Sequence, residues 1–156
     1  MKYGIGCDID EQRAIEKCLE SEKKGNKMAK ALRVFFGWEK PKNVEEAFLL
    51  FKEVYKKDEK FEKKETGLAL FFLGRIYHLG TGKKVNLEKA IKFYKLAIKK
   101  FKNTSAMNNL GLIYHEGKNE KKYHKALKLY EEAIQHNHLY AMVNLGILHL
   151  FSLKIL

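Results

Sequence analysis

Two stretches of the chain, ALFFLGRIYHLG at residues 69–80 and AMNNLGLIYHEG at residues 106–117, repeat one pattern of residues. Both fit A-x-x-x-L-G-x-I-Y-H-x-G, and the second lies 37 residues after the first. A third copy, AMVNLGILH at residues 141–149, follows 35 residues later. Self-similarity at a period of roughly 20–50 residues is typical of repeat architectures. The sequence therefore predicts an array of similar units.

A second pattern lies between these copies. KAIKFYKLAI at residues 89–98 matches KALKLYEEAI at residues 125–134, and looser copies surround Ala47 and Ala14. In both patterns the apolar residues recur at steps of three and four, which is helical spacing. Each unit therefore contains a helix A followed by a helix B. We expect A helices near 26–37, 66–79, 104–116 and 138–152, and B helices near 10–24, 43–57, 86–101 and 120–136.

Glycine recurs inside helix A, at Gly74, Gly111 and Gly146. Because glycine within a helix costs about 1 kcal/mol relative to alanine, its repeated use predicts that a neighbouring helix backbone passes close by. Four tyrosines are expected to fill the space between helices while keeping their hydroxyls near polar groups: Tyr77, Tyr114, Tyr94 and Tyr130. No single pair can bury its apolar face alone, so the pairs should stack into a solenoid.

Residues at the expected helix ends agree with these boundaries. Asn43 with Glu46 three residues later suits a capping box, and Asn86 stands where an N-cap is expected. Gly25 and Asn137 follow two B helices, where a left-handed residue commonly ends a helix.

These motifs resemble the Sel-one-like repeat (SLR) family, a relative of the tetratricopeptide repeat. The resemblance rests on Leu73-Gly74, Tyr77, Gly80-Thr81-Gly82, Val85, Lys89-Ala90, Tyr94 and Ala97, and again on Leu110-Gly111, Tyr114, Gly117, Lys125-Ala126, Tyr130 and Ala133. It implies an all-α fold, an α-α superhelix in the form of a right-handed solenoid of stacked antiparallel helix pairs. We expect one helical-repeat domain over 1–156 with about three and a half units, near 1–25 (partial), 26–65, 66–103, 104–137 and 138–156 (partial).

The chain departs from the family pattern in places. The first complete unit has Arg33-Val34 where the others have Leu-Gly, and the charged connection from Lys56 to Thr66 predicts extended helix ends or a mobile loop. Residues 3–7 resemble an inter-helix loop. The apolar helix from Leu145 to Leu153 favours a longer protein, with self-association through this exposed C-terminal helix as the alternative.

Composition narrows the classes of function. The net charge is +12, but only three of the 31 basic residues are arginine. Because sites that read bases or grip phosphates favour arginine, nucleic acid is disfavoured as a partner, and polyanion or nucleic-acid binding through the lysine-rich surface is the alternative function. No apolar run reaches the ~20 residues of a membrane span, and no signal peptide is seen, which predicts a cytoplasmic protein. Cys7 and Cys18 are expected to be reduced, with Cys18 in a helix core.

No motif predicts catalysis or metal binding. His78 and His115 occupy equivalent repeat positions and are interpreted as part of the inner surface. The segment from Gly80 to Lys84 lacks the full phosphate-loop pattern and is expected to be the turn between helices A and B. We therefore expect no catalytic residue, no metal and no cofactor, and a protein that is not an enzyme.

The best candidate site is the concave face, which helix A lines in tetratricopeptide-like pairs. The resemblance implies that an asparagine at the positions of Asn109 and Asn144 holds the backbone or terminal carboxylate of a peptide, because an amide both donates and accepts hydrogen bonds. The alternative for both positions is an asparagine that is solvated or has a structural role. The predicted function is a protein–protein interaction adaptor or scaffold that binds a peptide or protein in this groove. The candidate binding residues are Phe72, Arg75, His78, Asn108, Asn109, Leu112, His115, Asn144 and Ile147.

Overall fold

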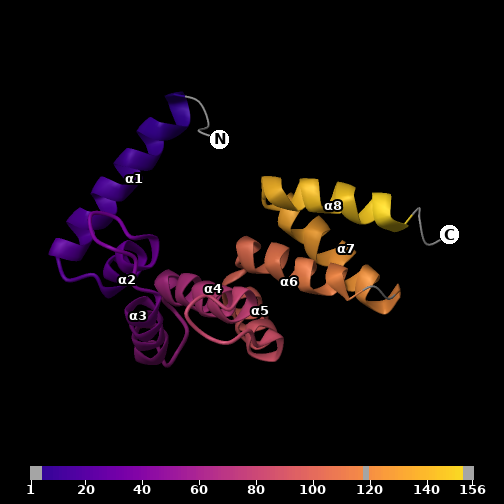
Figure 1. Ribbon diagram of the computed structural model, residues 1–156. Coiled ribbons are helices and arrows are strands. Elements are labelled where there is room, and N and C mark those ends of the chain that lie inside the picture. Colours follow the sequence, from indigo (N-terminus) through magenta and orange to yellow (C-terminus); the bar gives the residue numbers. More distant parts are fainter. Residues whose placement is uncertain (1–4, 118–119, 153–156) are drawn as a thin grey trace.

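The structure is a computed structural model that describes residues 5–117 and 120–152, and these residues form eight α-helices without a β-strand (Figure 1). Four are A helices: α2 (Lys27–Phe36), α4 (Lys64–Leu79), α6 (Thr104–Glu116) and α8 (Leu139–Ser152). Four are B helices: α1 (Ile5–Lys23), α3 (Val44–Lys57), α5 (Leu87–Phe101) and α7 (Glu120–Gln135). Each helix packs against the next one along the chain, and α6 also contacts the A helices α4 and α8. The predicted all-α helical-repeat solenoid is confirmed.

The helix boundaries follow the predicted ones closely, except at α1. This helix begins at Ile5 rather than near residue 10, so residues 5–7 are helical and the loop predicted there is wrong. Gly6 falls in the first helical turn, and glycine costs only about 1 kcal/mol in a helix relative to alanine, so it does not prevent helix formation. Tyr3, Gly4 and Leu153 lie outside the described residues.

Asparagine caps the N-termini of four helices. The side-chain oxygens of Asn26, Asn43, Asn86 and Asn103 accept hydrogen bonds from the backbone N–H groups of Ala29, Glu46, Lys89 and Ala106, at 2.8–3.0 Å. Each bond satisfies a donor that the first turn leaves free, a contribution of about 1 kcal/mol. The N-caps at Asn43 and Asn86 confirm the prediction, but the capping box at Asn43 is incomplete, because the Asn43 backbone N–H donates to the carbonyl oxygen of Val34 at 3.0 Å rather than to Glu46. Left-handed backbone at Gly25 (φ 86°) and Asn137 (φ 60°) ends α1 and α7, also as predicted.

The helix-A glycines make room for tyrosine rings. A Cβ atom on Gly74 would lie 2.6 Å from the ring of Tyr94, and one on Gly111 would lie 2.5 Å from the ring of Tyr130. The expectation of a close helix backbone is therefore wrong, because the aromatic ring of the paired helix B takes that space. At Gly146 an added Cβ would meet no described heavy atom within 4 Å.

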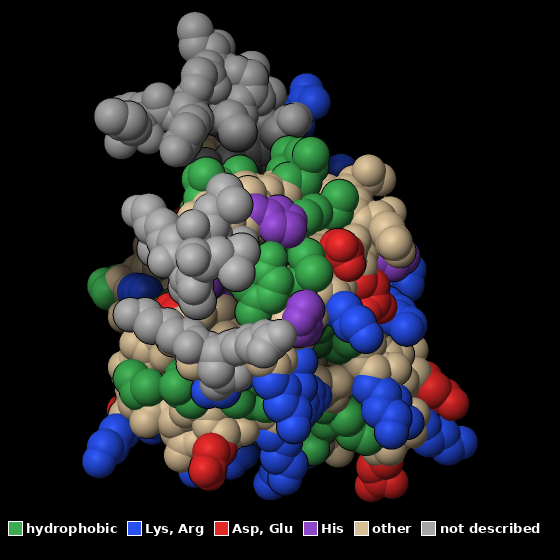
Figure 2. Space-filling model, turned by 90° about the vertical axis from the view of Figure 1, so that its right-hand side faces the viewer, with side chains coloured by type: hydrophobic (Ala, Val, Ile, Leu, Met, Phe, Trp, Pro, Cys, Tyr) green, Lys and Arg blue, Asp and Glu red, His purple; other side chains and the backbone are tan. Residues whose placement is uncertain are grey.

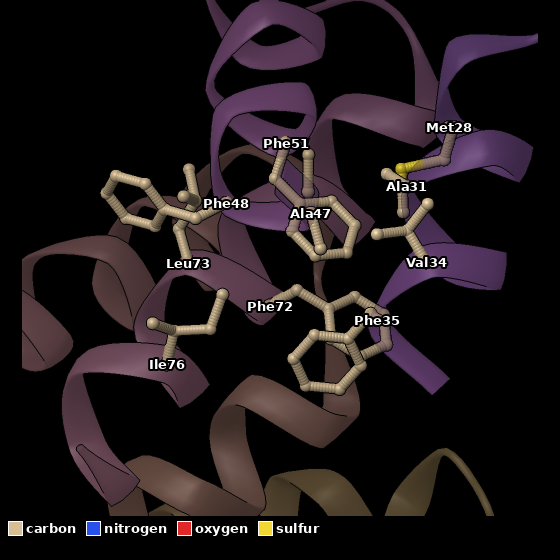
Figure 3. Packing of buried hydrophobic residues seen from close by; sticks show 11 residues of the cluster. Met28, Ala31, Val34, Phe35, Ala47, Phe48, Phe51, Phe72, Leu73 and Ile76 are labelled. Atoms are coloured by element: carbon tan, nitrogen blue, oxygen red, sulfur yellow. The ribbon is translucent and has the colours of Figure 1, made fainter. Parts of the chain in front are cut away.

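Aromatic rings hold the first complete unit to the second. Phe51 of α3 and Phe72 of α4 stack in parallel with centroids 5.0 Å apart, and Phe35 of α2 meets both rings edge-on (Figure 3). All three side chains are buried. Val34 and Phe51, which stand where the other units have glycine and tyrosine, belong to this same cluster. In this unit the larger Val34 replaces glycine on helix A, and the smaller Phe51 replaces tyrosine on helix B.

A charged pair joins α1 to α2. Arg33 donates from Nε to Glu22 Oε2 at 2.6 Å and from Nη2 to Oε1 at 3.0 Å, although Arg33 is only 9% exposed. The hydrogen bonds from Arg33 hold the pKa of the Glu22 carboxyl below its ordinary value. In the second and third units the equivalent positions hold Ile98 and Leu110, which pack in one apolar cluster. The charged residue Arg33, which replaces the leucine of the repeat pattern, is therefore accompanied by a charged partner, Glu22, at a position that is apolar in the second unit.

The charged connection between α3 and α4 is ordered around Asp58. Its carboxylate accepts hydrogen bonds from Thr66 Oγ1 at 2.7 Å and from the backbone N–H groups of Lys63 and Glu62 at 2.9 and 3.1 Å. These hydrogen bonds lower the pKa of Asp58, and the bond from Thr66 has the largest effect. Helix α4 begins at Lys64, slightly before the predicted start, so of the two expectations the extended helix end is the one observed.

Cys18 lies partly buried at the contact between α1 and α2 as a free thiol. Its Sγ donates to the carbonyl oxygen of Ala29 at 3.5 Å, and burial raises its pKa. The side chain of Cys7 lies outside those that the structure describes.

Candidate functional site: a polar hollow on the A-helix face

A shallow hollow of about 340 Å³ lies where α4, α6 and α8 meet. Aromatic, amide and basic side chains line it together. The lining residues are Phe71, Arg75, Ser105, Asn108, Asn109, Leu112, His138, Tyr140 and Asn144. They come from three successive A helices and the turn before α8, so the hollow follows the direction in which the repeats stack.

A continuous chain of hydrogen bonds crosses the hollow. Asn144 donates to Asn108 Oδ1 at 2.8 Å, Asn108 donates to Asn109 Oδ1 at 3.3 Å, and Asn109 donates to Tyr94 OH at 3.3 Å. The Tyr94 hydroxyl lies 3.4 Å from His78 Nδ1. Side chains of α8, α6, α5 and α4 are thereby connected. These hydrogen bonds hold the amides in place before a ligand binds to any one of them.

The repeat positions in this chain are bonded differently from unit to unit. Asn109 and Asn144 are equivalent, yet Asn109 donates to the Tyr94 hydroxyl whereas Asn144 donates to Asn108. The Tyr130 hydroxyl, which corresponds to that of Tyr94, is buried without a hydrogen-bond partner among the described residues. Burial raises the pKa of Tyr94 to about 12 and raises the pKa of Tyr130 as well, so both hydroxyls stay protonated at neutral pH.

The lining of the hollow carries basic and neutral groups but no carboxylate. The Arg75 guanidinium lies 5.7 Å from the centre of the Phe35 ring, a cation–π contact that supports it from one side. Burial lowers the pKa of His78, with Glu116 acting in the opposite direction, so its imidazole is neutral at pH 7. The hollow therefore favours ligands that offer carboxylate or carbonyl oxygens.

The structure brings five of the nine predicted binding residues together in the hollow: Arg75, Asn108, Asn109, Leu112 and Asn144. His78 is partly buried and joins the network through Tyr94, outside the lining. His115 and Ile147 lie on α6 and α8 and do not line the hollow.

Phe72 is the member of the predicted set that the structure contradicts. Its side chain is only 5% exposed and stacks on Phe51 in the first core cluster, so it points away from the groove. The neighbouring residue Phe71 lines the hollow instead. Adjacent residues of a helix point about 100° apart, so Phe72 faces the core although Phe71, next to it, lines the hollow.

Four lining residues were not predicted: Phe71, Ser105, His138 and Tyr140. Ser105 and Tyr140 occupy the same repeat position, 35 residues apart, so the spacing that selected Asn109 and Asn144 would also have selected them. His138 precedes α8, and its Nδ1 accepts a hydrogen bond from the backbone N–H of Ala141 at 3.3 Å. The prediction covers helix-A positions near the Leu-Gly pair, and His138 lies before the start of α8.

The residues that the structure describes contain no group of three His, Cys, Asp or Glu side chains placed to hold a metal ion. None of the described helices has both the length and the apolar character that crossing a membrane requires.

Stacked helix pairs with a polar hollow along one layer define a helical-repeat protein. The sequence model of the Sel1 repeat matches residues 26–57, 67–100 and 104–138, which together make up more than half of the chain. The chain therefore belongs to the Sel1 repeat family. Sel1 repeats generally form scaffolds for protein–protein interaction.

Solved structures show the same fold. A Sel1 repeat protein from Oxalobacter formigenes superposes with a TM-score of 0.64 at 22% identity over 86% of this chain and 53% of its own. A protective antigen present in uropathogenic Escherichia coli strains, which displays an SLR fold, gives 0.64 at 22% identity over 85% of this chain and 27% of its own. The chain thus spans about half the length of the first protein and about a quarter of the second. No curated protein matches the chain.

Proposed function

We propose that this protein is a cytoplasmic, non-catalytic adaptor that holds a protein or peptide in the hollow between α4, α6 and α8. The observation that carries the proposal is the chain of amides from Asn144 through Asn108 to Asn109, placed beside Arg75 in a lining without carboxylates. Membership of a family of interaction scaffolds supports it.

The chemistry of the hollow suits an extended peptide. The amides of Asn109 and Asn144 both donate and accept, as a peptide backbone does, while the buried Asn108 connects them. Arg75 offers a planar fork of donors that matches a carboxylate, from an acidic side chain or a C-terminus. Phe71, Leu112 and Tyr140 give apolar surface around these groups. We therefore expect ligands that combine an acidic group with an extended, partly apolar segment.

The experiment is a pull-down from cell extract with mass-spectrometric quantification, at about 50 mM and about 300 mM salt, where surface electrostatics are screened to different degrees. The bait is compared with an Asn109→Ala/Asn144→Ala variant. The matched control is Lys92→Ala/Lys128→Ala, which changes two exposed and equivalent positions on the B helices. A thermal melt establishes that each bait is folded.

A protein retained at high salt, lost with the asparagine variant and kept by the lysine variant would support the proposal. Binding that both double variants retain equally would contradict a role for the hollow.

The alternative function, binding of polyanions or nucleic acid, has its own support in the net charge of +12. Lysines such as Lys92, Lys95 and Lys128 are exposed on B helices, away from the hollow. Such binding would fall steeply with salt and would be indifferent to Asn109 and Asn144. Capture of nucleic acid alone, released by salt and weakened by the lysine variant, would favour this alternative over the adaptor.

A further inference from the structure

The outer face of α8 is apolar and open. Among its exposed residues Met142 is 54% and Val143 is 61% exposed, and no described helix covers this face. Figure 2 views this end of the molecule, and hydrophobic side chains gather there with basic side chains beside and below them. Apart from Tyr140, which lines the hollow, the exposed apolar residues of α8 are Leu139, Met142, Val143, Ile147 and Leu150. An apolar surface of this kind commonly marks an interaction site.

One of these repeat positions, that of Met142, is fully buried in both preceding A helices. Met142 corresponds to Met107 of α6 and to Leu70 of α4, and both of these side chains are fully buried. Gly146 corresponds to Gly111 and Gly74, whose missing Cβ atoms give space to tyrosine rings. At Met142 and Gly146, helix α8 therefore has the residue types of an A helix that is covered by a helix B, but these positions are exposed.

The contacts at Gly74 and Gly111 show which kind of helix can pack against an A helix at this glycine. In α7 the stripe Ala126, Tyr130 and Ala133 is fully buried, and the ring of Tyr130 occupies the notch at Gly111. In α5 the stripe Ala90, Tyr94 and Ala97 has the same spacing and is also fully buried. The common pattern is A-x-x-x-Y-x-x-A, in which small residues let the helices approach and tyrosine fills the notch.

A second copy of this chain does not supply that pattern. Helix α1 is a B helix, and its Ala14 is exposed where Ala47, Ala90 and Ala126 are buried, so its own A-helix side is open. At the position of the tyrosine, however, α1 has Cys18. A thiol is much smaller than a phenol ring, so α1 docked on α8 would leave the notch at Gly146 empty, at a cost in packing.

We propose that the outer face of α8 is a docking site for an amphipathic helix of a partner protein that carries the stripe A-x-x-x-Y-x-x-A, with the tyrosine ring seated on Gly146. The interface repeats the contacts that α7 makes with α6 and that α5 makes with α4. It lies on the outer side of α8 and is separate from the amide network of the hollow.

The probe is a labelled synthetic peptide with the sequence of residues 120–137, which contains the stripe around Tyr130, titrated into the full chain by fluorescence anisotropy. We expect saturable binding to the chain. Tyr130→Ala in the peptide, and separately Gly146→Leu in the chain, should each weaken binding at least tenfold, about 1.4 kcal/mol. Because no described atom lies near the Gly146 Cβ position, Gly146→Leu should leave the chain folded, which a thermal melt verifies.

Three results would overturn the proposal. The first is the absence of saturable binding. The second is binding that withstands both substitutions, because this would mean that the peptide binds elsewhere, for example in exchange for the chain's own α7. The third is sedimentation of the chain alone as a dimer that Val143→Glu dissociates, because the occupant of this face would then be a second copy.

Discussion

The glycines of the A helices occupy one repeat position in two different environments. At Gly111 the space of a side chain is filled by the Tyr130 ring, and at Gly146 the same space is open. A glycine in a helix loses backbone entropy on folding relative to alanine, so the residue is unfavourable locally at both positions. Only at Gly111 does a contact within the described chain compensate for it.

We therefore expect opposite effects from the same substitution. Gly111→Ala should destabilise the chain by about 1–3 kcal/mol, because its Cβ would overlap a buried ring that has little room to move. Gly146→Ala should be neutral or stabilise by up to about 1 kcal/mol through helix propensity alone. Urea unfolding followed by circular dichroism measures both changes. Equal effects at the two positions would show that the Tyr130 contact does not explain Gly111.

The hydrogen-bond partners of individual side chains could not be predicted from the sequence. The identity of Asn109 and Asn144 was visible in the repeat, but their different partners were not, since the choice between Tyr94 and Asn108 depends on how α6 and α8 are spaced. The sequence also does not show that Phe71, rather than the predicted Phe72, lines the hollow. Apolar period alone does not say which of two adjacent residues faces the core when both faces of the helix are contacted.

The contact between α1 and α2 differs from the equivalent contact between α5 and α6 because it contains an ion pair whose arginine is buried. Glu22 and Arg33 stand where Ile98 and Leu110 pack between α5 and α6. A pair removed from water is sensitive to loss of one member, because the other charge is left without its partner. Replacing both charges by apolar residues of similar volume avoids that penalty.

The chain's own repeats provide the substitutions that test this contact. Glu22→Ile and Arg33→Leu should each destabilise by about 1–3 kcal/mol, while the double variant should be near wild type or more stable. The double-mutant cycle, measured by urea unfolding, gives the coupling energy. Because the folded pKa of Glu22 is below its ordinary 4.5, this coupling should be full above that pH and lost as the pH falls through the folded value. Additive single effects at pH 7 would contradict it.

For the whole molecule, the sequence determined the architecture because the two patterns recur in register. Helix order, the helix boundaries other than the start of α1, and the N-caps at Asn43 and Asn86 follow from spacing and residue type. The hollow followed only in part, because its lining joins residues from α4, α6 and α8 whose relative placement depends on the curvature of the stack. The order at Asp58 was also missed, since a run of charged residues is normally read as solvated loop.

Stability should vary along the stack, because each unit of a repeat protein is stabilised mainly by its neighbours. Helix α4 packs against α3 and α5 and contacts α6, and its Leu70, Leu73 and Ile76 are fully buried. Helix α8 has described neighbours on one side and exposes most of its apolar residues. Local opening is easiest where few buried contacts must be broken.

We therefore expect native-state hydrogen exchange, followed by mass spectrometry, to be slowest in α4 and α5 and at least tenfold faster in α1 and α8. Addition of about 0.5 M sodium chloride should preserve this order, because burial rather than charge determines it and screened charges lie mainly on the surface. Uniform exchange across all helices would mean that the chain opens as one cooperative unit, and the nearest-neighbour account of its stability would then be wrong. Fast exchange in α4 with protection in α8 would show that the outer face of α8 is covered in solution.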